Sequence, residues 1–184
     1  MNCEKGADQK MTLFQLMNSD IKAKALWLYG SDSRGDLLKV LLTDGTFAML
    51  MYRFMQASHK TGLFPFTMLF NKLITWFGGC VIGRGADFGP GFVLIHALGV
   101  VINTNVQGGS HVYLEHQVTI GAEKGMAPVL GNHIFVGAGA KILGPVKVGD
   151  QVRVGANAVV LEDVPDNATC VGVPAKNILK EKQN

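Results

Sequence analysis

The chain has 184 residues, of which 48% are hydrophobic and 17% charged, and its formal net charge is +3 at pH 7. This composition excludes a disordered chain, because disordered segments combine few apolar residues with a high net charge. The size suits one folded unit with an appended helical segment. The weak and scattered positive charge argues against a nucleic-acid partner and is compatible with an anionic small molecule.

The cysteines indicate the compartment. Cys3, Cys80 and Cys170 do not have the C-x-x-C spacing of a metal site, so no metal is expected. Their odd number suits a reducing compartment better than a disulfide framework.

The first residues lack the apolar core of a secretory signal, and a charge interrupts every apolar run before it reaches the length of a membrane span. We therefore expect a cytoplasmic protein.

The first part of the chain is expected to be helical. Residues 10–77 carry apolar clusters at three- and four-residue spacing, which predicts three or four helices. The clearest lie at about 44–60, with Asp44 or Thr46 as the N-cap, and at about 63–77.

These two helices are rich in Phe, Met and Leu, more than a lone surface helix requires. We expect them to pack against the rest of the chain or against a neighbouring subunit. Peripheral contact with a membrane, with Arg53 and Lys60 among the basic residues at the lipid surface, is an alternative that the sequence leaves open.

A six-residue repeat dominates the second half of the chain. One column of aliphatic residues consists of Leu130, Val136, Ile142, Val148, Val154 and Val160, and a second consists of Ile134, Ala140, Val146, Val152, Ala158 and Val164. A period of six matches neither an α-helix nor an isolated strand, and it indicates a coil that returns to the same orientation after each short face. We predict a mainly β fold, a left-handed parallel β-helix of hexapeptide repeats preceded by an α-helical segment.

The repeat begins before this regular stretch and is interrupted twice. Between Leu94 and Ile102 the spacing is eight residues, and between Ile120 and Leu130 it is ten, so two insertions should bulge from the coil. Loops that project from a rigid repeat are common places for binding groups. The expected organisation is a helical segment at 1–78, the β-helix at 79–173 and a C-terminal tail at 174–184.

Two histidines are the best candidates for chemistry. His96 and His116 each lie two residues after a column residue, Leu94 or Leu114, and should point out of the prism. Their separation of twenty residues is one eighteen-residue coil plus the inserted pair, so the two imidazoles are expected on neighbouring coils about 5 Å apart. A neutral imidazole can accept a proton from an alcohol at neutral pH, which makes this pair a candidate general base.

The segments GADFGPGFVLIHALG, EHQVTIGAEKG and PVLGNHIFVGAGAKILGPVKVGDQVRVGANAVVLEDVPDNATCVGVPAKNI resemble the serine acetyltransferase branch of the hexapeptide-repeat acyltransferases. The resemblance covers the whole chain from about residue 44. It implies acetyl-CoA as the donor and a homotrimer whose active sites lie between neighbouring prisms.

The resemblance also implies roles for single residues. His96 lies where the family's DHATG motif has its catalytic histidine, which takes the proton of the acceptor hydroxyl so that the alcohol attacks the thioester directly. The residues expected to contact coenzyme A are Gly121, Ala138, Gly139, Ala156 and Lys176.

Several family positions on the acceptor side are changed. Ile95 replaces the aspartate before the histidine, Val81 replaces the acid of the DIHP motif, and Met126 and Ala127 replace an Arg-His pair. His116 replaces a glutamine. The donor side is retained, so we expect an O-acetyltransferase whose acceptor is the hydroxyl of a sugar or a polysaccharide precursor.

Three alternatives stay open at this stage. The first is the serine O-acetyltransferase of cysteine biosynthesis, and the second is an N-acyltransferase acting on an amino sugar. The third, favoured by Val81 and Ile95, is a trimeric scaffold or regulatory subunit without catalytic activity.

Overall fold

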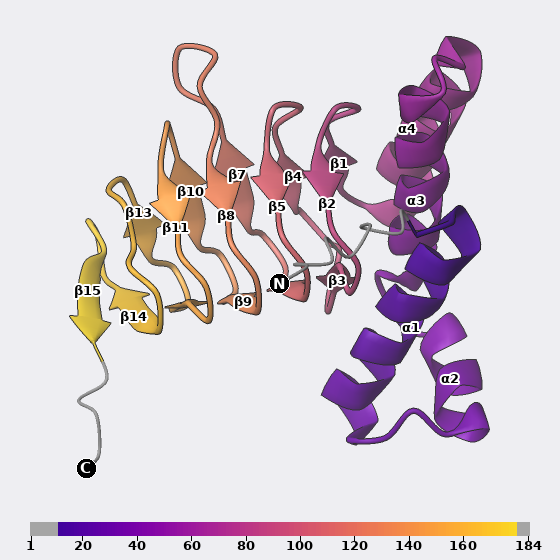
Figure 1. The fold of residues 1–184 in the computed structure, drawn as a ribbon, viewed down its shortest axis with the longest axis horizontal. Coiled ribbons are helices and arrows are strands. Elements are labelled where there is room, and N and C mark those ends of the chain that lie inside the picture. Colours follow the sequence, from indigo (N-terminus) through magenta and orange to yellow (C-terminus); the bar gives the residue numbers. More distant parts are fainter. Residues whose placement is uncertain (1–10, 180–184) are drawn as a thin grey trace, which may run out of the picture.

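The computed structural model describes residues 11–179, so Cys3 lies outside the described part of the chain. In this described part, four helices lie together at one end of a prism of short parallel strands, and the chain winds away from them coil by coil (Figure 1). The expected left-handed parallel β-helix with preceding helices is confirmed.

The helices precede the β-helix. Their bounds are Leu13–Tyr29 (α1), Arg34–Leu41 (α2), Thr46–Lys60 (α3) and Phe64–Gly78 (α4). The prediction that Asp44 or Thr46 caps α3 is wrong. The N-cap is Gly45, in the left-handed region with φ +79°, and no side chain caps the helix. Thr46 is already the first helical residue, and the Asp44 carboxylate bonds elsewhere.

Within residues 11–179, fifteen short strands form the β-helix and its end. Their bounds are Val81–Ile82 (β1), Asp87–Phe88 (β2), Val93–Leu94 (β3), Val101–Ile102 (β4), Gln107–Gly108 (β5), Val112–Leu114 (β6), Thr119–Gly121 (β7), Val129–Leu130 (β8), Ile134–Val136 (β9), Lys141–Leu143 (β10), Lys147–Val148 (β11), Arg153–Val154 (β12), Val159–Val160 (β13), Ala168–Val171 (β14) and Lys176–Leu179 (β15). They form three faces: β1-β4-β7-β10-β13, β2-β5-β8-β11 and β3-β6-β9-β12-β14-β15.

The strand register explains the two breaks in the repeat. Val81 pairs with Val101 across the coil that contains the first insertion, whereas Val101 pairs with Thr119 across a regular one. The second insertion forms the loop between β7 and β8, which projects beyond the other turns (Figure 1) and is closed by an antiparallel bridge between Glu123 and Met126. Both insertions therefore bulge outward without disturbing the ladders.

The two predicted columns form the core of the prism. Each of their twelve residues is at most 3% exposed. Small and β-branched side chains suit the narrow interior, because their restricted rotamers pack well against the neighbouring coil. The first coil carries the larger Phe88, and the next coil accommodates it with Gly108, where a Cβ would lie 2.3 Å from the Phe88 ring.

The segment expected to be a tail contains a strand. β15 pairs antiparallel with β14, so it closes the β3 face at the C-terminal end of the prism. The backbone of β14 is thereby paired on both sides, and β15 becomes the edge strand of this face.

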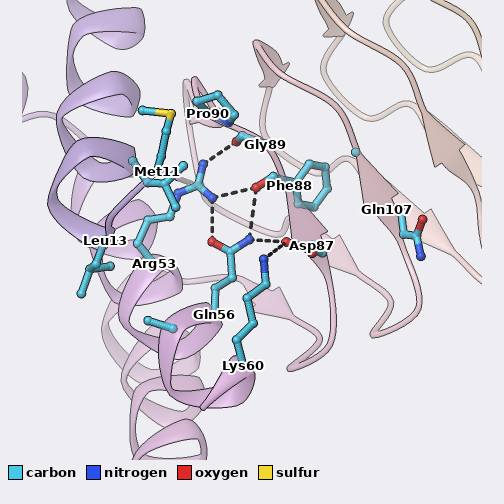
Figure 2. A pocket seen from close by; sticks show the side chains of 13 residues that line it. Met11, Leu13, Arg53, Gln56, Lys60, Asp87, Phe88, Gly89, Pro90 and Gln107 are labelled. Atoms are coloured by element: carbon cyan, nitrogen blue, oxygen red, sulfur yellow. Dashed lines mark hydrogen bonds and ion pairs between the residues drawn. The ribbon is translucent and has the colours of Figure 1, made fainter. Parts of the chain in front are cut away.

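A buried ion pair joins the helices to the first coil. Arg53 of α3 donates to both carboxylate oxygens of Asp20 in α1, over 2.7 and 2.9 Å. Arg53 also donates to the backbone carbonyls of Phe88 and Gly89, and the Phe92 amide donates to Asp20. Figure 2 shows the bonds from Arg53 to the strand carbonyls beside a cavity of about 460 Å³. The pair links two helices and the prism through one network.

The two apolar helices differ in burial. α3 buries residues along most of its length, whereas α4 buries only Thr67 and Ile74. Exposed aromatic side chains of α4 are Phe64, Phe66, Trp76 and Phe77. None of the helices between residues 11 and 179 combines the length and the apolar character needed to cross a bilayer. Packing of α4 against a neighbouring subunit stays a prediction.

Replacing Asp20 by Asn should destabilise the fold by about 3–5 kcal/mol, because the buried Arg53 charge would lose its counter-ion. Chemical denaturation followed by circular dichroism measures this change. The control is Lys22→Gln, which removes an exposed pair with Asp32 and should alter stability little. Equal effects of the two substitutions would contradict the proposed importance of the buried pair.

Candidate active site

One edge of the prism carries both candidate histidines. The column residues Leu94, Leu114, Val136 and Val154 are aligned in register along the β3 face. Two residues after each of them, at the turn toward the β1 face, lie His96, His116, Ala138 and Ala156. Because the coils are in register, these four residues form a line along one edge.

The two imidazoles are close together and face outward. Their ring centroids are 6.1 Å apart in an edge-to-face arrangement, and the side chains of His96 and His116 are 55% and 47% exposed. Glu115 lies beside His116, with Oε2 3.6 Å from Nδ1. The geometry agrees with the stacking predicted from the twenty-residue separation.

The edge continues with small residues. The Gly139 amide donates to the His116 carbonyl over 2.9 Å, and the Asn157 amide donates to the Ala138 carbonyl over 2.8 Å. Gly139 has φ +71°, and a Cβ there would lie 2.2 Å from the Asn157 side-chain oxygen, so the turn requires glycine. Beyond the two histidines, the edge therefore offers accessible backbone without large side chains.

The other two expected coenzyme contacts lie apart from this line. Gly121 is the last residue of β7 and pairs with Leu143, at the end of the β1 face remote from His116. Lys176 begins β15 opposite Val171, near the C-terminal end of the edge. The structure thus gathers Ala138, Gly139 and Ala156 beside the histidines, with Lys176 farther along and Gly121 on a different edge.

Sequence reasoning missed the acid beside His96. Oδ2 of Asp44, in the turn between α2 and α3, lies 3.3 Å from Nδ1 of His96. The only sequence signal was an Asp-Gly pair before an apolar run, which indicates a helix start and says nothing of a partner 52 residues away.

A buried lysine supports the same turn. Lys24 of α1 is fully buried, and its ammonium group donates to the backbone carbonyl of Asp44. Burial lowers the pKa of Lys24 to about 8, and the negative charge of Asp44 opposes part of this shift. Burial also raises the pKa of the neighbouring Cys80 thiol to about 12, with a further contribution from Asp44. Cys80 is therefore a neutral packing residue at neutral pH.

Two positions at which the resembled family has acids are apolar in this chain. Ile95 is 4% exposed, so its side chain is buried and offers no polar group to a ligand bound at the edge. Val81 is 46% exposed on β1 and offers no polar group. Asp44 is the one carboxylate in the described part of the chain that bonds His96.

The cavity beside Arg53 is a different feature. Its lining includes Arg53, Gln56 and Lys60, whose polar atoms bond Phe88, Asp87 and one another (Figure 2). None of its lining residues belongs to the edge of His96. Within residues 11–179, no cluster of three or more His, Cys, Asp or Glu side chains is arranged to hold a metal ion.

The left-handed β-helix of six-residue repeats places the chain among the hexapeptide-repeat proteins. The family model for bacterial transferase hexapeptide (six repeats) matches residues 127–162. A serine acetyltransferase of Helicobacter pylori (strain J99) is 43% identical over 147 residues, which cover 78% of this chain and 86% of that protein.

Solved structures agree. The crystal structure of serine acetyltransferase from Neisseria gonorrhoeae has a TM-score of 0.84 at 27% identity, covering 94% of this chain and 68% of that one. A serine acetyltransferase in complex with CoA has a TM-score of 0.82 at 28% identity, covering 90% and 69%. The chain belongs to the serine acetyltransferase family. It is an acyltransferase with acetyl-CoA as its co-substrate. This finding contradicts the alternative of a trimeric scaffold or regulatory subunit without catalytic activity.

Lys24 should make the stability of the protein depend on pH. Because its pKa falls from 10.5 to about 8 on folding, the unfolded chain binds more protons between these two values. The free energy of unfolding should therefore rise with pH across this window, by up to about 3 kcal/mol from this group. Denaturation of the protein and of Lys24→Met from pH 7 to pH 10.5 measures the contribution as the difference between the two curves. Parallel curves would contradict it.

Proposed function

We propose that this protein transfers the acetyl group of acetyl-CoA to a hydroxyl group, with His96 as the general base. The observation that carries the proposal is the position of His96, exposed on an edge that continues with small residues. Acetyl-CoA supplies an activated thioester, and the protein needs to supply a base and to orient the two reactants.

His96 takes the proton from the acceptor hydroxyl, and the resulting oxygen nucleophile attacks the thioester carbonyl directly. The C–S bond of the tetrahedral adduct then breaks, and the departing coenzyme A thiolate takes up the proton held by His96. No acyl-enzyme is needed, because the acceptor itself is the nucleophile. His116, with its ring centroid 6.1 Å from that of His96, is placed to contact the acceptor or to take over part of the proton transfer.

The proposed coenzyme site runs along the same edge. Ala138, Gly139 and Ala156 let a long, narrow ligand approach the backbone, and Lys176 provides a cation for a phosphate near the end of the edge. Gly121 lies on a different edge, so its proposed contact requires a neighbouring copy of the chain. We infer a homotrimer, which would also cover the half-exposed imidazoles.

L-serine is the proposed acceptor. The relatives that cover most of the chain are named serine acetyltransferases, and this supports serine over the sugar acceptor that the sequence led us to expect. A sugar hydroxyl stays as the second candidate, because the buried Ile95 provides no carboxylate for the amino group of an amino acid.

The first experiment tests the base and the acceptor together. With acetyl-CoA and L-serine, the purified protein should release free thiol, and His96→Ala should lower kcat by about 10²- to 10⁴-fold. Parallel assays with hexoses and amino sugars test the other acceptors. Near-normal turnover by His96→Ala would overturn the mechanism, and turnover of sugars without turnover of serine would overturn the proposed acceptor.

The second experiment tests the coenzyme edge. Ala156→Trp should raise the KM for acetyl-CoA about tenfold, since an indole on the edge would cost roughly 1.4 kcal/mol of binding. It should leave kcat at saturation nearly unchanged. Lys147→Trp, on the separate β2 face, is the matched control and should not change KM. An unchanged KM for Ala156→Trp would place the coenzyme elsewhere.

A further inference from the structure

The carboxylate beside His96 comes from the helical segment. In the β-helix, two positions at which the resembled family has acids hold Val81, exposed on the β1 face, and Ile95, which is buried. Oδ2 of Asp44, which belongs to the turn before α3, nevertheless lies 3.3 Å from Nδ1 of His96. The imidazole of His96 thus has a carboxylate partner, and this partner comes from the helical segment instead of the β-helix.

We propose that Asp44 is the positioning residue for the catalytic imidazole of this enzyme. The proposal rests on the proposed role of His96 as the base. When Nδ1 of His96 donates its hydrogen to Asp44, Nε2 carries the free lone pair and can accept the proton of the acceptor. The carboxylate also favours the imidazolium that forms during proton transfer.

The fold holds the Asp44 turn against the strand that leads to His96. Gly45 has φ +79°, and a Cβ at this position would lie 2.6 Å from the carbonyl oxygen of Leu94. Glycine therefore allows the turn to approach the end of β3, two residues before His96. A larger residue would force the turn and its carboxylate away from the imidazole.

Two further contacts fix the turn from the other side. The ammonium group of the buried Lys24 donates to the Asp44 carbonyl, so α1 holds the backbone of the turn. The hydroxyl groups of Thr43 and Thr46 both donate to the carbonyl of Val40, over 2.8 and 2.7 Å, which closes the end of α2 onto the start of α3. The carboxylate is thus exposed on a backbone that is tied down at several points.

This arrangement gives the helical segment a part in catalysis. The ion pair between Asp20 and Arg53 links α1 and α3 to the first coil, and the turn between α2 and α3 then carries Asp44 to the edge. Because the side chains of Asp44 and His96 are 58% and 55% exposed, solvent weakens the charge interaction and orientation is its main effect.

The test compares variants at Asp44. Asp44→Ala and Asp44→Asn should lower kcat roughly 10- to 100-fold. This loss is smaller than the loss expected when the general base itself is removed. The KM for acetyl-CoA should stay within about twofold, because Asp44 contacts His96 and is not among the residues proposed to contact the coenzyme. Asp44→Glu, which keeps the charge, should recover part of the lost kcat. Asp32→Asn, an exposed acid elsewhere in the helical segment, is the matched control and should behave as the unmodified protein.

A direct readout does not depend on turnover. Nitrogen-15 NMR of the histidine rings, assigned with His96→Ala, should show the Nδ1–H tautomer of His96 in the unmodified protein and a mixture of tautomers in Asp44→Ala. An unchanged tautomer together with an unchanged kcat in Asp44→Ala would overturn the proposal.

The outcomes separate this inference from the proposed function. If His96→Ala is inactive but Asp44→Ala keeps full kcat, His96 is the base and Asp44 does not position it. If His96→Ala keeps its activity, the proposed base is wrong, and a catalytic role for Asp44 through His96 fails with it. In the His96→Ala background, Asp44→Ala should change the residual rate by less than about twofold, since two residues acting as a unit are not additive.

Discussion

The in-register stacking of successive coils is the constraint on which the structure depends. Each parallel ladder places the same slot of every hexad at the same corner, so inward slots form a continuous core and outward slots form continuous edges. A single register shift would expose the core columns and separate His96 from His116. Core and site are therefore two consequences of one pairing, and the two insertions are tolerated because they leave the ladders in register.

The prism alone provides the proposed base and the proposed coenzyme edge, but the carboxylate that bonds His96 comes from outside the prism. The helical segment supplies that acid through the turn that carries Asp44, and the buried pair of Asp20 and Arg53 joins this segment to the first coil. The helices are thus more than a cover for the end of the solenoid. Their attachment determines where a carboxylate lies relative to His96.

Membership of the serine acetyltransferase family and the local changes around His96 bear on different parts of the reaction. The family assigns the donor, and the small residues along the edge are consistent with it. Val81 and Ile95 change the acceptor side and remove the acids expected there. The donor side is retained and the acceptor side is changed. This difference explains why the sequence led to a sugar acceptor, whereas the relatives support serine.

The sequence by itself determined the β-helix, its core columns and the stacking of His96 on His116, because a six-residue period fixes which side chains share a face. It also predicted the two apolar helices. Only the tertiary structure decided the partner of His96: Asp44 lies 52 residues earlier, and its local pattern indicates a helix cap. The burial of Lys24 could not be predicted from the sequence either. Both depend on how the helices pack against the first coil, and no repeat in the sequence encodes that packing.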